Sequence, residues 1–367
     1  MRALLLWVVV ACNSNASSTQ PTATKPPTPL PTPTTNTGTV SVRVDRRIEL
    51  LSILHRLIGH QAYTSGPVTP YVKAVDAAFA PFANHPAVLA TRALRASHSI
   101  TWDAPLILAV HLDEQLQLLN ADELATLDPR FKGADVASYA ATLRDFARDS
   151  KLNEFLAAHR QYFTNVETGV QAIFDKAKPV GWFDDFFGAK ANARYLVAPG
   201  LLTGNRNFGV RATLPDGTQE FYQVLGMRAA DGLPVDDALT ESLLVHEMAH
   251  SYVNPLIEAH RAAFEAGGAK LFALVAASMK RQAYDSWKIF VDESIVRALV
   301  VLYTLDRHGK AAANQEAQLQ IQNDFRWTPD LAKLLLRYQA QRATYADFAA
   351  FVPKVAKTFD ALAANAK

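Results

Sequence analysis

The segment Leu243-Leu244-Val245-His246-Glu247-Met248-Ala249-His250-Ser251-Tyr252 contains the pattern H-E-x-x-H inside an apolar run. On a helix, residues four positions apart lie on one face, so the imidazoles of His246 and His250 can bind one metal ion. Glu247 can then reach a water molecule on that ion and act as a general base. Because this helix is apolar nearly all round, we expect it to be buried, where His and Glu must be paired or bound to a metal. The alternative is a surface helix with solvated His and Glu side chains.

A catalytic zinc ion has three protein ligands and keeps one position for water. The metzincin pattern is excluded, because Val253 and Leu256 stand where it needs Gly and His. The other common solution is a glutamate on a second helix, and Glu293 projects from an apolar stripe in the segment 291–300. We therefore predict Zn2+ held by the two histidines and Glu293. Asp292, Glu258, His260 and Glu265 are the alternatives for the third ligand.

These residues resemble the gluzincins, the zinc peptidases that include thermolysin and several aminopeptidase families. The second gluzincin motif often reads Asn-Glu followed by small or apolar residues, and Asp292-Glu293-Ser294-Ile295 is similar to it. The resemblance implies a zincin-like catalytic domain. The sequence departs from thermolysin-like members at Arg297, which stands where they have an Asp that orients a zinc-bound His. Another side chain or a backbone carbonyl must then accept from that His.

A closer resemblance covers most of the chain, to a family of bacterial exported proteins described as a domain of unknown function with a peptidase motif. The matching segments are residues 42–51, 84–88, 182–188 and 246–255. This resemblance implies an exported metallohydrolase and carries no known substrate.

The first residues predict export. A short positive region and an apolar run precede Val9-Val10-Ala11-Cys12, which reads as a lipobox with Cys12 as the lipidated residue. We predict a lipoprotein signal peptide over residues 1–11 and a lipid anchor at Cys12 in the membrane of a bacterial cell envelope; a secreted protein is the alternative. Residues 12–39, rich in Pro and Thr, are predicted to be a tether. Cys12 is the only cysteine, which favours an acylation site over a redox group.

The chain from residue 40 to residue 187 is predicted to be a helical lobe. Ala and Leu recur in it at helical spacing, with Pro and Gly clusters between the periodic segments. We expect helices over residues 47–57, 72–82, 104–119, 136–147 and 152–174.

Residues 188–367 are predicted to be a zincin-like metallohydrolase domain. Strand-like segments at 194–198, 207–214 and 220–226 come before the H-E-x-x-H helix. Helices are expected to follow through 271–279, 287–306 and 331–341. The predicted fold class is α+β and predominantly helical: a zincin-like catalytic domain with a small antiparallel sheet before the H-E-x-x-H helix, and a helical N-terminal lobe.

An edge strand of such a sheet can pair with an extended substrate backbone. Residues 207–211 are the candidate edge, with Asn207 and Gly209 as substrate-binding residues, since Gly allows close approach of another backbone. An ordinary packed hairpin is the alternative. The H-E-x-x-H helix is expected to begin near residues 236–237 and to end before Asn254-Pro255, because Pro disfavours continuation. That end would put His250 in the last turn.

The reaction also needs a group besides the metal to stabilise the oxyanion. We predict Arg297 as this catalytic residue, although it could instead neutralise Glu293 or bind a substrate carboxylate. The alternatives for the oxyanion are Tyr252, His260 and Tyr303.

The sequence thus predicts a zinc-dependent metallopeptidase that hydrolyses a peptide or protein substrate, with Glu247 as general base. One alternative is a catalytically inactive or zinc-stabilised cell-surface binding protein. The other is a zinc amidase that acts on a non-peptide or cell-wall amide. The formal net charge of +2, without a basic patch, argues against nucleic acid as a partner. The sequence does not predict an oligomeric state.

Overall fold

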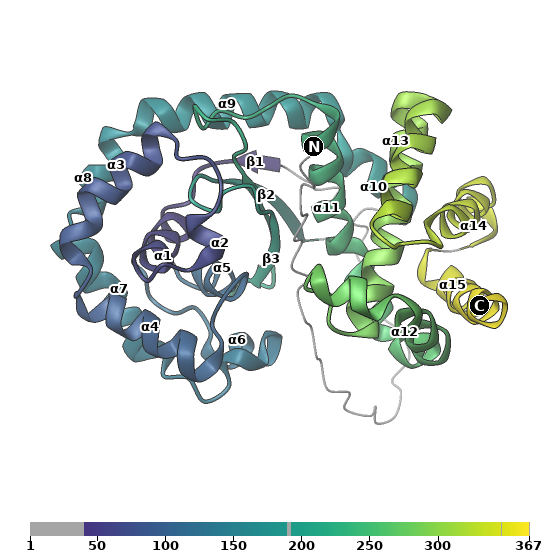
Figure 1. The fold of residues 1–367 in the computed structure, drawn as a ribbon, viewed down its shortest axis with the longest axis horizontal. Coiled ribbons are helices and arrows are strands. Elements are labelled where there is room, and N and C mark those ends of the chain that lie inside the picture. Colours follow the sequence, from purple (N-terminus) through teal and green to yellow (C-terminus); the bar gives the residue numbers. More distant parts are fainter. Residues whose placement is uncertain (1–39, 189–191, 346, 367) are drawn as a thin grey trace.

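A computed structural model describes residues 40–188, 192–345 and 347–366 of the chain. The predicted signal peptide, the lipidation site Cys12 and the tether lie outside the described residues. Helices dominate the fold, and a four-stranded sheet lies between two groups of helices (Figure 1).

The first part of the chain is helical after one short strand. Its elements are β1 (Val40–Val42), α1 (Arg46–Leu57), α2 (Gln61–Thr64), α3 (Pro70–Phe79), α4 (Pro86–His98), α5 (Ala104–Val110), α6 (Ala121–Leu127), α7 (Val136–Asp149), α8 (Leu152–Ala158), α9 (Arg160–Ala177) and α10 (Pro179–Phe187). In Figure 1, α3, α8, α7 and α4 form an arc around α1, α2 and α5, and α9 runs above them.

Two of the helices predicted in this part are shorter than expected. Helix α5 ends at Val110 because Asp113 accepts hydrogen bonds from the backbone N–H groups of Gln115 and Gln117, which closes a turn in place of another helical turn. The helix expected over residues 152–174 is two helices, α8 and α9. Between them the backbone of His159 leaves the helical region, and its Nδ1 bonds the carbonyl of Phe155.

The second part contains the remaining strands and five long helices. These are β2 (Ala193–Gly200), β3 (Phe208–Thr213), β4 (Gln219–Gly226), α11 (Ala238–Ala259), α12 (Glu265–Arg281), α13 (Trp287–Gln322), α14 (Thr328–Ala340) and α15 (Val352–Asn365). Short 3-10 turns lie at Ala80–Phe82, Pro129–Phe131, Arg261–Phe264, Arg342–Thr344 and Ala349–Phe351.

The sheet is mixed, so the prediction of an antiparallel sheet is wrong. Its order is β1-β2-β4-β3; β1, β2 and β4 are parallel, and only β3 pairs antiparallel, with β4. The physical reason is burial: β2 and β4 are buried along nearly their whole length, as central parallel strands are, whereas β3 alternates. The sequence predicts that residues 207–211 form an edge of the sheet. This position is confirmed for β3, which is the last strand in the sheet order.

Helix α11 carries the H-E-x-x-H pattern and lies between the sheet and α13 (Figure 1). It begins as expected, with Asp237 capping the N–H of Thr240. The predicted end before Asn254 is wrong, because the helix continues through Pro255 to Ala259. Proline removes only one backbone donor, and the buried Val253 and Ile257 hold the helix in the core on both sides of it. His250 therefore lies well inside the helix rather than in its last turn.

Helix α13 changes direction at Gly309, where φ is 81°. Arg297 and Gln320 illustrate the reversal, because Arg297 Nη1 donates to Gln320 Oε1 at 2.5 Å. In a straight helix, residues 23 positions apart would be about 35 Å apart at roughly 1.5 Å per residue. The glycine thus folds the second half of α13 back over the first.

One helical segment among the described residues, Arg261–Arg281, has the length and apolar composition of a membrane-spanning helix. Its α12 part packs against α13 and α15 with one face, and about a third of its apolar window is buried.

A buried carboxyl group in α1 makes the stability of the fold depend on pH. Burial raises the pKa of Glu49 to about 8, although the hydroxyl of Tyr71 donates to its Oε2 at 2.7 Å. The pKa of a glutamate in an unfolded chain is about 4.3. Between that pH and about 8, Glu49 therefore carries a proton in the folded state and has lost it in the unfolded state. In this window Glu49 lowers the free energy of unfolding as pH rises, by up to about 1.4 kcal/mol per pH unit.

We expect Glu49→Gln to flatten this dependence, because glutamine does not titrate. The measurement is urea denaturation from pH 5 to pH 8 of the wild type, the variant and Glu265→Gln, which changes an exposed glutamate. Parallel pH profiles for the wild type and Glu49→Gln would contradict the assignment.

Candidate metal centre

Helices α11 and α13 bring three metal-ligating side chains together. His246 and His250 come from α11 and Glu293 from α13, and all three are buried. The two Nε2 atoms are 3.3 Å apart, and they lie 3.5 Å (His246) and 3.3 Å (His250) from the Glu293 carboxylate oxygens. The corners of a tetrahedron around an ion with bonds of about 2.0–2.1 Å are roughly 3.3–3.4 Å apart. The three side chains can therefore serve as three corners of a tetrahedral metal site.

The carboxylates of the cluster lack the hydrogen bonds that buried carboxylates need. Among the described residues, neither oxygen of Glu293 and neither oxygen of Glu247 has a hydrogen-bond partner that satisfies normal geometry. Glu293 is fully buried and Glu247 nearly so. Glu293 has ion-pair contacts with Arg297 and the two histidines, whereas Glu247 has none among the described residues. A buried carboxylate without hydrogen bonds carries a large desolvation penalty that a further cation or a water molecule would reduce. The residues thus fit a bound cation.

The charges within the cluster set the protonation of its members. Burial holds the pKa of His246 well below its usual range, which leaves the imidazole neutral with a free lone pair. Burial also opposes charge on His250, but its contact with Glu293 and the charge of Glu247 outweigh this and raise its pKa to about 9. Despite burial, the two histidines and Arg297 lower the pKa of Glu293 to about 2. A metal ion would replace the proton on His250.

Glu247 is held differently from Glu293. Burial raises the pKa of Glu247 to about 7, with smaller effects of neighbouring charges. A carboxyl group that titrates near neutrality is suited to taking up and releasing a proton during a reaction.

Asn254 provides a hydrogen-bond acceptor for His250. The sequence leaves this acceptor unassigned, because Arg297 stands where thermolysin-like proteins have an Asp in that role. Oδ1 of Asn254 lies 3.1 Å from Nδ1 of His250 and accepts the proton there, so Nε2 faces Glu293 and His246. Sequence reasoning missed this residue. The available signal was its spacing, because Asn254 lies four positions after His250 on one helix and is buried.

Replacing Asn254 with Ala is expected to weaken metal binding about 10- to 100-fold, as loss of an orienting partner does at other metal sites. The helix itself should tolerate Ala. Competition with a metal chelator measures the affinity, and Asn314→Ala, at an exposed position in α13, is the matched control. Equal affinities for the two variants would show that Asn254 does not orient His250.

Arg297 lies at the cluster, but both Nη atoms of its guanidinium already have partners. Nη2 is 3.1 Å from Glu293 Oε2 and donates to the hydroxyl of Tyr284 at 2.9 Å. Nη1 donates to Gln320, and the group lies over the ring of Phe325, 4.1 Å from its centre. Of the three roles considered from the sequence, the geometry favours neutralisation of Glu293.

Of the two predicted substrate-binding residues, Gly209 lies beside Glu247 and Asn207 is bonded to the end of β4. A Cβ at Gly209 would be 3.4 Å from Glu247 Oε2, so the edge strand β3 passes directly beside this carboxylate. Asn207 lies just before β3 and is buried, and its Oδ1 accepts from the N–H of Gly226 at 3.0 Å. Its side chain thus ties β3 to the end of β4 and does not face Glu247.

The other candidates from the sequence are engaged elsewhere. Arg261 binds Asp292 with two hydrogen bonds of 3.0 Å and also binds Glu258. Glu265 is exposed, and His260 bonds the carbonyl of Leu256 at the end of α11. For the oxyanion, the hydroxyl of Tyr252 bonds Asp184 and Tyr195, and that of Tyr303 bonds Glu241 and the carbonyl of Ala177. None of these is brought to the His246, His250 and Glu293 cluster.

Comparison with known proteins identifies the family. Residues 40–358 match the family model described as "Domain of unknown function (DUF4932)". No curated protein and no solved structure matches the chain. The match includes all four strands of the sheet and the two helices, α11 and α13, that carry His246, His250 and Glu293. The chain therefore belongs to the family described as Domain of unknown function (DUF4932).

Proposed function

We propose that this chain is a zinc-dependent metallopeptidase. The observation that carries the proposal is the arrangement of His246, His250 and Glu293 as three corners of a tetrahedron, with the unpartnered carboxylate of Glu247 on the same helix. A purely structural metal site would be closed by a fourth protein ligand. No fourth His, Cys, Asp or Glu joins the cluster among the described residues, which supports a site with an open position.

The donor set supports zinc as the metal. Two imidazole nitrogens and one carboxylate oxygen are a ligand set of catalytic zinc, whereas magnesium and calcium prefer oxygen ligands alone. When bound, zinc would lower the pKa of a water molecule to near neutrality and polarise a substrate carbonyl. His246, His250 and Glu293 would hold the ion, and Asn254 would orient His250.

The side chains around the cluster have separate tasks in this proposal. Glu247 takes the proton from the attacking water and delivers it to the nitrogen of the leaving amine as the amide C–N bond breaks. Arg297 holds Glu293 in its ionised form and in position. The edge strand β3, which passes beside Glu247, would pair with the extended substrate backbone.

The test is digestion of a mixed peptide library by the zinc-loaded full chain, with and without a chelator. Isolated bacterial cell wall is digested in parallel, because the same zinc chemistry suits an amidase. Peptide cleavage that a chelator abolishes and added zinc restores supports the proposal. Release of cell-wall fragments without peptide cleavage would contradict the peptidase proposal and indicate an amidase. Zinc binding without either activity would indicate a zinc-binding protein that is not an enzyme of these two classes.

Export with a lipid anchor at Cys12 is part of the same proposal. It rests on the lipobox at residues 9–12 and on the tether that follows it. Metabolic labelling with a radioactive fatty acid should mark the wild type and not Cys12→Ala. Equal labelling of the two proteins would exclude Cys12 as the anchor.

A further inference from the structure

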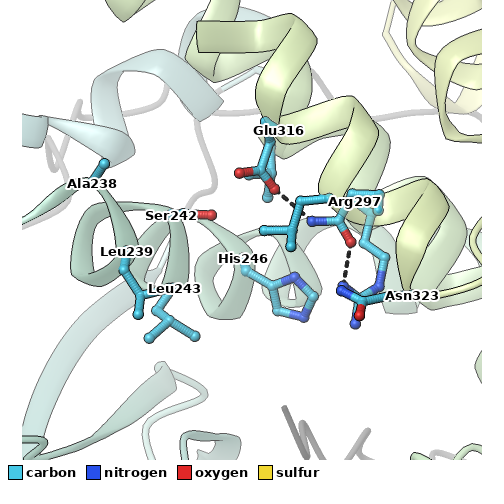
Figure 2. Close-up of a pocket in the computed structure, with 11 residues that line it drawn as sticks. Ala238, Leu239, Ser242, Leu243, His246, Arg297, Glu316 and Asn323 are labelled. Atoms are coloured by element: carbon cyan, nitrogen blue, oxygen red, sulfur yellow. Dashed lines mark hydrogen bonds between the residues drawn. The ribbon is translucent and has the colours of Figure 1, made fainter. Parts of the chain in front are cut away.

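A cavity of about 210 Å³ opens directly beside the metal cluster. His246 and Arg297 form one of its sides, and the first turns of α11 and the folded-back half of α13 form the others (Figure 2). Most of its wall is aliphatic, from Leu239, Leu243, Val300 and Leu319. A cavity of about 150 Å³ holds a benzene molecule, so this one has room for a long side chain.

One charged group faces this cavity without an ionic partner. Glu316 comes from the part of α13 beyond Gly309, and Figure 2 shows its carboxylate above the cavity, between Ser242 and Arg297. Its Oε1 accepts a hydrogen bond from the neutral amide of Gln320 at 2.5 Å. Among the residues described, no Lys, Arg or His lies within ion-pair distance of Glu316.

The nearby guanidinium does not meet this carboxylate directly. Arg297 lies 3.1 Å from Glu293 and is linked to Glu316 only through the amide of Gln320. Burial raises the pKa of Glu316, which reflects the cost of keeping this charge in a partly dry place. A cation inside the cavity would remove that cost.

We infer that this cavity binds the side chain of a substrate residue next to the scissile bond, and that it selects lysine or arginine, with Glu316 accepting from the cationic head and the aliphatic wall packing on the stem. The inference rests on the proposed function, whose substrate class it names. Long cationic side chains bury their methylene stems along apolar surface and keep the charged head with a polar partner. An aliphatic side chain would fill the wall but leave Glu316 unpaired, and an acidic one would be repelled.

Binding of small inhibitors tests the cavity even if no peptide is cleaved. The probes are the hydroxamic acids of Nα-acetyl-lysine, Nα-acetyl-norleucine and Nα-acetyl-glutamate, whose hydroxamates bind zinc and whose side chains differ mainly in charge. We expect the full chain, loaded with zinc, to bind the lysine compound about 10- to 100-fold more tightly than the norleucine compound, as a charge-assisted hydrogen bond provides. Equal or tighter binding of the norleucine compound would overturn the inference.

Glu316 variants assign the selectivity to one side chain. Glu316→Gln can still accept from Gln320, so its fold should be retained, and we expect the preference for the lysine compound to disappear. Glu316→Lys should reverse it in favour of the glutamate compound, whereas Glu265→Gln should leave it unchanged. Unchanged selectivity in Glu316→Gln would contradict the inference.

Peptide digestion separates this inference from the proposed function. Cleavage next to lysine or arginine, lost in Glu316→Gln while norleucine peptides are cut at an unchanged rate, supports both. Zinc-dependent cleavage next to aliphatic residues would leave a peptidase and overturn the cationic pocket. If no peptide is cleaved, the proposed function fails, and the hydroxamate binding decides the pocket.

Discussion

Glu247→Gln is expected to abolish hydrolysis while the protein keeps its metal ion. The variant leaves all three metal ligands in place and has nearly the same shape. It removes only the carboxylate that accepts a proton from water, and loss of a general base costs roughly 10²- to 10⁴-fold in rate. The measurements are zinc content by elemental analysis and the rate of peptide cleavage.

A glutamate on the same helix provides the control for this experiment. Glu258 lies near the end of α11 and pairs with Arg261 outside the cluster, so Glu258→Gln should retain both metal and activity. Full activity in Glu247→Gln would exclude it as general base. Loss of zinc from Glu247→Gln would instead mean that its carboxylate helps to bind the ion.

Glu293→Gln is expected to have the largest effect on the metal site itself. It removes the only carboxylate among the three ligands. Loss of a residue that merely orients a ligand lowers metal affinity by up to about 100-fold, so loss of the ligand itself should lower zinc affinity by more. The same change leaves the buried guanidinium of Arg297 without its anion. Breaking a buried ion pair in this way typically costs about 3–5 kcal/mol of stability.

A double variant separates the two effects of this substitution. Adding Arg297→Met to Glu293→Gln removes the uncompensated charge, so the free energy of unfolding should recover in part while zinc binding stays lost. Calorimetric titration with zinc and urea denaturation of the single and double variants measure both. Wild-type zinc affinity in either variant would show that Glu293 is no ligand.

The sequence predicts the metal cluster because its parts depend on local rules. The spacing of His246 and His250 places them on one helical face, and the apolar segment around Glu293 marks a buried helix. The structure brings these three residues together, as expected. The helical character of the chain and the three strand segments before α11 follow from local patterns in the same way.

The features that the sequence does not predict depend on distant parts of the chain. The parallel pairing of β2 with β1 and β4 joins segments that local alternation does not relate, so an antiparallel sheet was expected. The proximity of Gln320 to Arg297 needs the reversal at Gly309, where a single positive φ redirects α13. The pocket beside His246 exists only because of that reversal, and neither spacing nor composition signals it.

The continuation of α11 through Pro255 illustrates a local rule overridden by packing. Proline disfavours a helix, but the residues before and after it are buried against the core. The same continuation places Asn254 one turn beyond His250, where it binds Nδ1. A helix that ended before Asn254 would not position this side chain.

The central claim is that His246, His250 and Glu293 bind one zinc ion, and X-ray absorption spectroscopy of the zinc-loaded full chain tests it most directly. We expect one zinc per chain, with two imidazole nitrogens and one or two light oxygen ligands at about 2.0–2.2 Å. The imidazole scattering should fall by about half in His246→Ala and in His250→Ala, and it should be lost in the double variant. A zinc ion with oxygen ligands alone, or an unchanged spectrum in these variants, would contradict the claim.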